Sequence, residues 1–597
     1  MFRPARWARR RPVAAVLALT ALALLLRLVA LGARTMHWDE ARVAYWTLRY
    51  VRGAGFAYRP VIHGPFVPIT VAPLFELLGP TAFAARLPVA VLGGLAPLAA
   101  LLFRRTATSA SSALDVGLDD AETVALAALL AVTPSLVYYS RFMRSDVPLA
   151  VFALFALGFA VRALATGRRR HVLASGLFVG LAIPTKENVL LYAACALGTA
   201  AVAICWPAVV PLLPWHDESE PKTAATAALR SAIGRARAAL ARHLPAAPLA
   251  LLVALVPVVF FLAPRGPAGD PTLSAALAGE AGWLALIERA TVGTWETFAS
   301  SFWASSRGHS YPIYAGKLLG YLLVGALPVV VGAGVAFVRE LRSPSRPLVV
   351  PLFAWGVAAM LGYPLATDIP APWISLHIAF PLFVPAAVGW IAIVRERAWA
   401  VDLPDADTLP DAGTRRRYAR YALAALVVLS AVQVPLVVAA SSITPPLYVN
   451  VLAQSAQPPD DLSSMGAAVD DSADDGGVLF YGEAYYLPNE TIDDDPPTAG
   501  EQWLGWWLNR LPMAWYVERA GAESSYARDP AALRERESIP PVVFAAPPEA
   551  DGAASVLDQR GYERTRYELG LYHEQAVVVF VDESRLGDGA ADRSVHS

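Results

Sequence analysis

The sequence predicts an α-helical membrane protein that crosses the bilayer many times and ends in a small α/β domain. Hydrophobic residues make up 56% of the 597 residues, and the mean hydropathy is +0.44. They cluster in runs of about 20 residues, the length that a helix needs to cross the hydrocarbon core. After Ala440 these runs stop and the composition becomes acidic. We therefore expect a transmembrane domain over residues 1–440 and a second domain over residues 441–597.

The apolar runs indicate about eleven transmembrane helices. In chain order they are Val13–Ala33, Leu87–Phe103, Thr123–Tyr139, Val147–Leu164, Val172–Ile183, Val189–Pro207, Leu249–Leu262, Leu318–Val338, Leu348–Leu365, Ile374–Val394 and Tyr421–Ala440. The first run follows several arginines, as a secretory signal would. We interpret it as an uncleaved span, because it is long and a polar motif follows it directly.

Loop charges predict which side each loop faces. With eleven spans, six basic segments fall on one side: Arg3 to Arg11, Arg104-Arg105, Arg168 to Arg170, Lys222 to Arg242, Arg339 to Arg346 and Arg395 to Arg420. Basic loops stay in the cytoplasm. We therefore expect a multi-pass cell-membrane protein with a cytoplasmic N-terminus and an extracytoplasmic C-terminal domain. The short apolar stretch Pro65–Gly79 contains two further prolines and predicts an interfacial or re-entrant helix.

The C-terminal region differs from the rest in charge and in periodicity. It holds about 27 of the 50 acidic residues and no lysine. Val478–Tyr481, Val542–Ala545 and Ala576–Val581 are typical of strands, and the aromatic-rich Glu501–Val517 predicts a helix. The acidic composition suits a protein kept soluble at high salt. A merely solvated acidic tail is the other interpretation.

Polar side chains gather in the loops that we expect to face outward. The first outer loop carries adjacent Asp39 and Glu40, together with Arg42, Arg59 and His63. The later outer segments add Arg141, Arg144 and Asp146, then Lys186 and Glu187, then His309, and finally His377 in the next span. Ionisable groups at a membrane boundary are costly unless solvated or paired, and they often mark function.

This set of residue types suits the transfer of a sugar from a polyprenyl phosphate. A carboxylate can act as a base or hold a polarising metal. The sugar develops oxocarbenium character as its bond breaks, and Lys or Arg stabilises the leaving phosphate. The chain has no glycine-rich loop that would cradle a nucleotide, which disfavours a cytosolic nucleotide-sugar mechanism. The expected partners are the bilayer, a polyprenyl-phosphate-linked sugar donor and a glycan or protein acceptor, with no nucleic acid.

Several short motifs carry a family resemblance. Asp39-Glu40, Ser140-Arg141-x-x-Arg144-x-Asp146 and Thr185-Lys186-Glu187 resemble the GT-C membrane glycosyltransferases, which include protein O-mannosyltransferases and the aminoarabinose transferase of lipid A. His37-Trp38-Asp39-Glu40-Ala41, His63-Gly64-Pro65 and Pro372-Trp373-x-x-x-His377 resemble a narrower, mostly haloarchaeal group, named for association with flippase activity in N-glycosylation. The resemblance covers roughly Val13 to Val394.

The resemblance implies roles for these residues. Asp39 would be the general base or would orient the acceptor, with Glu40 as the neighbouring acid and Asp146 as a second catalytic carboxylate. Asp39 and Asp146 are also the candidate ligands of a divalent cation, Mg²⁺ or Mn²⁺. Lys186 would contact the lipid phosphate. The further candidates for substrate binding are Arg141, Arg144, Arg42, His63, His309 and His377.

Each candidate also has a structural interpretation. Acids suit the N-terminus of an interfacial helix, Asp146 could cap the fourth span, and Lys186 could pair with Glu187 or extend to the interface. The histidines could be hydrogen-bonded structural residues. We interpret Arg27 and Glu76 as structural, because their surroundings in the sequence are apolar. For the whole chain, one alternative is a non-enzymatic protein that binds lipid-linked sugar and assists its flipping. An ordinary transporter would tend to show repeat symmetry, and the sequence has no convincing internal repeat.

Overall fold

A computed structural model describes residues 12–105, 117–216, 218–304, 308–367, 369–396, 412–443, 450–453, 456–486, 507–571 and 575–586. The helices before residue 270 are α2 (Pro12–Leu28), α3 (Trp38–Arg49), α4 (Phe66–Leu78), α5 (Ala82–Leu95), α6 (Ala100–Phe103), α7 (Asp120–Val132), α8 (Pro134–Tyr139), α9 (Asp146–Thr166), α10 (Arg169–Ala182), α11 (Val189–Val209), α12 (Pro221–His243) and α13 (Ala247–Leu262). Those that follow are α14 (Leu273–Ala278), α15 (Trp283–Glu288), α16 (Thr294–Ala304), α17 (Tyr311–Arg342), α18 (Val349–Ala366), α19 (Ile374–Ala379), α20 (Phe383–Glu396), α21 (Ala412–Val438), α22 (Ser463–Ser472), α24 (Met513–Ala520), α25 (Pro530–Arg534) and α26 (Ala550–Leu557).

The protein is a helical, multi-pass membrane protein. Within the described residues, eight helical stretches are long and apolar enough to cross a bilayer: Ala82–Phe103, Asp146–Thr166, Val189–Leu212, Pro221–Leu262, Tyr311–Arg342, Val349–Ala366, Ile374–Arg395 and Ala424–Ser442. The other three predicted spans fall on the shorter helices α2, α7 with α8, and α10. The number eleven therefore stays a prediction.

The third predicted span, Thr123–Tyr139, is broken. α7 ends at Val132, and α8 begins at Pro134. Proline disfavours the helical conformation in the residue before it, and Thr133 accordingly has φ −58° and ψ 123°. This segment is predominantly apolar in the sequence, but its backbone forms two helices.

Close helix contacts in the bundle depend on small residues. A Cβ added to Gly389 on α20 would lie 1.8 Å from the carbonyl oxygen of Gly332 on α17. Only glycine allows two backbones to approach this closely, a common device in membrane helix pairs. Large apolar side chains such as Leu197 and Leu251 point outward instead, and both are more than 70% exposed, as expected of groups that face lipid.

The C-terminal part forms a five-stranded mixed sheet. The strands are β1 (Val478–Tyr481), β2 (Ser524–Ala527), β3 (Val542–Ala545), β4 (Glu563–Glu568) and β5 (Ala576–Val581), in the order β2-β1-β3-β5-β4. β1 pairs in parallel with β2 and β3, whereas β5 pairs antiparallel with β3 and β4. The three predicted strands coincide with β1, β3 and β5. The two missed strands, β2 and β4, form the edges. β4 is mostly exposed and β2 ranges from exposed Ser524 to buried Ala527, and neither strand carries an apolar run.

The predicted helix Glu501–Val517 is partly wrong. Its first six residues lie outside the described ranges, residues 507–509 are helical, and the chain then turns over residues 510–512 before α24 runs from Met513 to Ala520. Pro512 immediately precedes the helix, and it cannot donate a backbone hydrogen bond inside one. The helix therefore starts after this proline.

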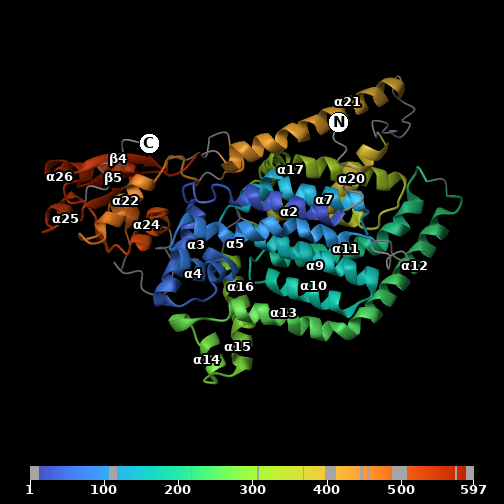
Figure 1. Ribbon diagram of the computed structural model, residues 1–597, viewed down its shortest axis with the longest axis horizontal. Helices are drawn as coiled ribbons and strands as arrows, with labels where there is room; N and C mark the ends of the chain where they lie inside the picture. Colours follow the sequence, from blue (N-terminus) through green and yellow to red (C-terminus); the bar gives the residue numbers. More distant parts are fainter. Residues whose placement is uncertain are drawn as a thin grey trace.

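The sheet domain packs against one end of the helical bundle, beside α3 and α4 (Figure 1). One hydrophobic core runs from the bundle into the inner face of the sheet, and it includes Trp46, Trp507 and Phe480. The Trp507 ring lies 5.4 Å from the Tyr45 ring and 5.6 Å from the Trp46 ring. The other face of the sheet is covered by α25 and α26 in a separate core. The predicted domain boundary at residue 440 lies in the helical turn Ala439–Ile443 and stays a prediction.

Candidate active site

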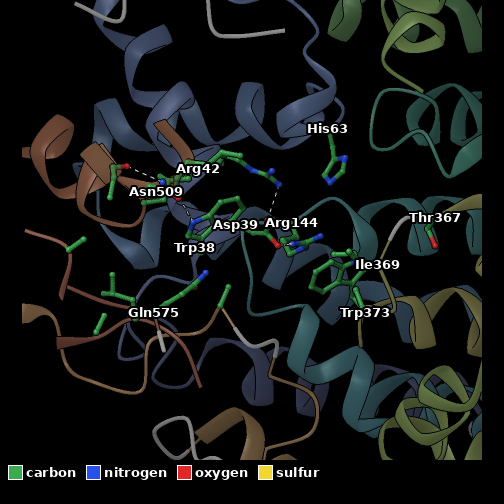
Figure 2. A pocket seen from close by; sticks show the side chains of 18 of the residues that line it. Trp38, Asp39, Arg42, His63, Arg144, Thr367, Ile369, Trp373, Asn509 and Gln575 are labelled. Atoms are coloured by element: carbon green, nitrogen blue, oxygen red, sulfur yellow. Dashed lines mark hydrogen bonds and ion pairs between the residues drawn. The ribbon is translucent and has the colours of Figure 1, made fainter. Parts of the chain in front are cut away.

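A cavity of about 700 Å³ opens where the helical bundle meets the sheet domain. Such a volume is typical of sites for small ligands. The bundle contributes Trp38, Asp39, Arg42, His63, Arg144, Lys186, Asn188, Thr367, Ile369, Ala371, Trp373 and Ile374, and the C-terminal part contributes Ala456, Ala484, Tyr485, Leu508, Asn509, Leu511, Ala546, Pro547, Pro548, Leu569, Gln575 and Ala576. Figure 2 shows Arg144 and Trp373 on one side of this space, and Asn509 and Gln575 on the other.

Asp39 lies at the first turn of α3, on the wall of the cavity. His37 caps the helix, and its Nδ1 accepts a hydrogen bond from the Asp39 backbone N–H at 3.0 Å. The Asp39 carboxylate accepts from Arg42 Nη2 through Oδ1 at 2.8 Å, and from Arg144 Nη1 through Oδ2. Its side chain is 9% exposed. Asp39 is therefore an ion-paired carboxylate that keeps a small opening to the cavity.

Glu40 points away from the cavity into the protein. Arg86 on α5 binds both of its oxygens at 2.8 Å, Arg34 adds a bond at 2.9 Å, and the Met143 N–H adds another at 2.9 Å. Burial alone would raise the pKa of the Glu40 carboxyl, but the charges of Arg34 and Arg86 outweigh it and lower the pKa to about 2. This geometry favours a structural role for Glu40, as a joint between α3, α5 and the loop before α9, over the predicted catalytic one.

Asp146 is the first residue of α9 and is fully buried behind the cavity wall. Its Oδ1 accepts hydrogen bonds from Lys186 Nζ at 2.8 Å and from His377 Nε2 at 2.9 Å. Its Oδ2 accepts from Arg144 Nε at 3.2 Å. His377 is held in turn by Tyr192 Oη at 2.9 Å from Nδ1. The carboxylate thus gathers side chains from three segments that are far apart in the sequence.

Arg144 connects the two carboxylates. Its guanidinium binds Asp39 and Asp146, and it lies 3.7 Å from the centre of the Trp373 ring. A guanidinium over an aromatic face is stabilised by the ring quadrupole. These contacts hold the Arg144 guanidinium between the two carboxylates, at the edge of the cavity.

Lys186 lies on the loop between α10 and α11, with 6% of its side chain exposed. Burial lowers the pKa of its ammonium group, and the Asp146 carboxylate opposes this, leaving the pKa below its ordinary value. Of the charged side chains that line the cavity, Arg42, Arg144 and Lys186 are cationic and Asp39 is anionic. The lining therefore has an excess of positive charge and suits an anion.

His63 lines the cavity from the loop before α4. Its Nδ1 lies 3.1 Å from Glu187 Oε2, and Glu187 Oε1 accepts from Tyr58 Oη at 2.8 Å. The His63 backbone has φ 64° and ψ −158°, a conformation that is essentially restricted to glycine and costs about 1–3 kcal/mol. The next residue, Gly64, touches the Lys186 loop so closely that a Cβ there would lie 2.2 Å from the Pro184 carbonyl oxygen.

Three predicted substrate-binding residues do not reach the cavity. Arg141 caps the end of α2, where its guanidinium donates to carbonyl oxygens that include those of Val29 and Ala30 at 2.7 and 3.0 Å. His309 Nε2 lies 2.7 Å from the Pro364 carbonyl oxygen, outside the lining. His377 is behind Asp146. By contrast, Arg42, His63, Arg144 and Lys186 all line the cavity, and their role in substrate binding stays a prediction.

Other lining residues were not predicted. Trp38 and Trp373 belong to quoted motifs, so the sequence contained a signal for them. Tyr485, Asn509 and Gln575 come from the C-terminal part. No chemical motif marks these three, because their place depends on how the sheet domain docks.

The residues present do not fit the predicted divalent cation. Mg²⁺ and Mn²⁺ take several oxygen ligands with open lone pairs. Asp39 and Asp146 are separated by the Arg144 guanidinium, which binds both of them. The described part of the chain holds no group of three or more His, Cys, Asp or Glu residues placed to bind a metal.

Two family models match the chain. Residues 62–210 match the model described as "Dolichyl-phosphate-mannose-protein mannosyltransferase". Residues 460–582 match the model described as "Agl23 flippase-associated protein C-terminal domain". Residues 62–210 therefore resemble the GT-C mannosyltransferases, and residues 460–582 resemble the Agl23 C-terminal domain. The family resemblance predicted from the short motifs is thereby confirmed.

Solved structures of two proteins resemble this chain at low sequence identity. ArnT from Cupriavidus metallidurans in the apo state is 15% identical, with a TM-score of 0.46, over 96% of this chain and 98% of that one. The same protein bound to undecaprenyl phosphate is 16% identical, with a TM-score of 0.46, over 96% and 99%. The S. cerevisiae protein O-mannosyltransferase Pmt1–Pmt2 complex bound to the sugar donor is 20% identical, with a TM-score of 0.30, over 42% and 34%. No curated protein matches the sequence.

Proposed function

We propose that this protein is a membrane glycosyltransferase that moves a sugar from a polyprenyl (dolichyl) phosphate to a lipid-linked glycan or protein on the outer face. The cavity carries this proposal: it joins a carboxylate, Asp39, to the cations Arg42, Arg144 and Lys186 at one end of a membrane bundle. The mannosyltransferase match adds support, because residues 62–210 include Arg144, Asp146 and Lys186.

The positive side of the cavity suits the donor phosphate. A polyprenyl phosphosugar is a phosphodiester with one negative charge, and its phosphate gains a second charge when the bond to the sugar breaks. Lys186 and Arg144 stabilise that developing charge, which is the main means of lowering such a barrier. Asp146 and His377 hold the two cations in place through the bonds described above.

Asp39 orients the acceptor. Two guanidinium groups bind its oxygens, and such bonds favour the charged carboxylate and weaken it as a proton acceptor. Each carboxylate oxygen has a second lone pair, which can accept a hydrogen bond from an acceptor hydroxyl. Of the two predicted roles, the orienting role therefore agrees better with these contacts.

The remaining lining favours a glycan over a polypeptide as the acceptor. The side-chain amides of Asn188, Asn509 and Gln575 can bond to sugar hydroxyls. Trp38 and Trp373 offer flat apolar faces for the sugar rings. Amides and aromatic faces together suit a polyhydroxylated ligand.

The arginine-rich loops support an outward-facing site. α12, in a loop predicted to be cytoplasmic, lies at the end of the bundle opposite the sheet domain (Figure 1). If basic loops stay inside, the cavity and the sheet domain face outward.

Reconstituted vesicles that carry dolichyl-phosphate mannose labelled in the sugar test this proposal. We would follow label transfer to lipid-linked glycans and proteins extracted from the source cells, and label movement between leaflets. We expect wild type to transfer label and Asp39→Asn to bind donor while losing at least about 100-fold in transfer rate. Asp551→Asn, which changes an exposed carboxylate on α26, is the matched control and should behave as wild type.

A second candidate function is non-enzymatic assistance of flipping, favoured by the Agl23 flippase-associated match. It predicts that neither wild type nor Asp39→Asn transfers label while both accelerate leaflet exchange equally. That result would overturn the transferase proposal.

A further inference from the structure

A second basic group borders the cavity, separate from the Asp39 network. We propose that His63, oriented by Glu187, accepts the proton of the acceptor hydroxyl during sugar transfer, and that Glu187 is its positioning residue. This inference rests on the proposed function.

The contacts of the His63 ring leave one nitrogen available. Because the Glu187 carboxylate accepts a hydrogen bond from Nδ1 at 3.1 Å, Nδ1 carries the proton and Nε2 carries the lone pair. Within the described ranges, Nε2 has no hydrogen-bond partner, and Figure 2 shows the ring extending from its loop into the cavity. The side chain is 27% exposed, which leaves room for an acceptor hydroxyl.

Glu187 is itself held in place. Tyr58 Oη donates to Oε1 at 2.8 Å, while His63 binds Oε2. Burial raises the pKa of the Glu187 carboxyl, but the bonds from His63 and Tyr58 outweigh it, and the pKa lies below its ordinary value. An ionised Glu187 stabilises the imidazolium that forms when His63 takes a proton, as the carboxylate does in other base–carboxylate pairs.

The backbone at His63 supports a functional role. Its φ of 64° and ψ of −158° suit glycine, and a residue with a side chain persists there only when its surroundings demand it. The bonds from His63 N–H to the Pro60 carbonyl at 3.2 Å and from Gly64 N–H to the Thr185 carbonyl at 3.2 Å keep this conformation. The strained backbone directs the imidazole into the cavity.

The charges around His63 keep it a neutral base. Burial and the nearby cations Lys186 and Arg42 lower its pKa, Glu187 raises it, and the balance lies below the ordinary value of a histidine. His63 is therefore unprotonated at neutral pH. Asp39 faces two guanidinium groups and is a weaker acceptor, as argued above.

The transfer step balances with His63 as the proton acceptor. The acceptor oxygen forms a bond to the anomeric carbon of the sugar, and the bond from that carbon to the phosphate oxygen breaks. The electron pair stays on the phosphate beside Lys186, and the hydroxyl proton moves to His63 Nε2. The products are the glycosylated acceptor, polyprenyl phosphate and an imidazolium that later releases its proton to water.

His63→Gly tests the inference, because glycine tolerates this backbone and the variant should fold. With dolichyl-phosphate mannose as the donor, we expect transfer to fall by about 100-fold or more, the range typical of lost general-base catalysis. Added imidazole should raise the transfer rate of the variant about tenfold. This rescue should grow as pH rises, because more of the free imidazole is then neutral. His243→Gly, at the end of α12 and away from the cavity, is the control and should retain wild-type transfer and show no imidazole effect.

The pH profile tests the positioning role. In wild type, transfer should decline as pH falls through the pKa of His63, and Glu187→Gln should move this decline to lower pH, because the carboxylate no longer raises that pKa. The inference is overturned if wild type transfers sugar and His63→Gly is equally active, or if imidazole restores nothing while donor binding is intact. If wild type itself transfers no sugar, the proposed function fails and this role with it.

Discussion

The two walls of the cavity differ in charge. The wall made by the helix ends contains every charged lining residue, Asp39, Arg42, Arg144 and Lys186. Among the described residues of the C-terminal part that line the cavity, none is charged, and Asn509 and Gln575 are amides. We infer that the charged wall of the bundle performs the chemistry, and that the neutral wall of the sheet domain helps to recognise the acceptor.

The walls also differ in how their residues are fixed. On the bundle side, Lys186, Asp146 and Arg144 hold one another at 2.8 and 3.2 Å. On the other side, Asn509 donates to the Ala484 carbonyl oxygen at 3.0 Å, and its neighbour Leu508 accepts from Trp38 Nε1 at 3.1 Å. Preorganised charges suit transition-state stabilisation, whereas separate hydrogen bonds suit ligand recognition.

Lys186→Met should have the largest effect. It removes a cation from the predicted position of the leaving phosphate, so transfer should fall by about 100- to 1,000-fold. Lys186→Arg, which keeps the charge, should lose less. Single-turnover transfer from dolichyl-phosphate mannose measures both rates, and similar losses in the two variants would remove the charge argument for this wall.

Glu40→Gln should affect stability more than Asp39→Asn does. Removing the charge leaves Arg34 and Arg86 buried without their partner, and breaking such a pair costs about 3 kcal/mol or more. The pKa of Glu40 is lowered to about 2. Its contribution to stability is therefore complete above pH about 4.5 and is lost as pH falls toward about 2.

Thermal unfolding in detergent between pH 3 and pH 7 measures this difference. The melting temperature of wild type should fall more steeply with acid than that of Glu40→Gln. If Asp39→Asn is instead the less stable variant, the division between an inner structural acid and an outer functional one is wrong.

Asn509→Ala and Gln575→Ala should have the smallest effects. Each removes one acceptor hydrogen bond, worth about 1 kcal/mol, so KM for the acceptor should rise about fivefold with little change in kcat. Steady-state transfer at varied acceptor concentration separates the two constants. A fall in kcat together with weaker donor binding would place the donor on this wall as well.

The sequence predicted the charged wall better than the neutral one. Ionisable residues such as Asp39 and Lys186 stand out in an apolar chain, because burying them is costly without a purpose. Asn509 and Gln575 are ordinary residues of a polar domain, and only the docking of Trp507 against Tyr45 and Trp46 brings their segments to the cavity.

Within the charged set, sequence could not separate structural from cavity-facing residues. Asp39 and Glu40 are adjacent, yet successive helical residues point about 100° apart, and this rotation places one at the cavity and the other in the core. Arg141 and Arg144 share one motif, but Arg141 caps α2. The sequence does not show where the end of α2 lies in space.

The position of bound donor tests the central claim most directly. We would determine the structure of Asp39→Asn with dolichyl-phosphate mannose by cryo-electron microscopy, since this variant should bind donor without consuming it. We expect the phosphate within hydrogen-bond distance of Lys186 Nζ, and the sugar between the charged wall and Asn509. A phosphate bound outside this cavity, away from Lys186 and Arg144, would contradict it.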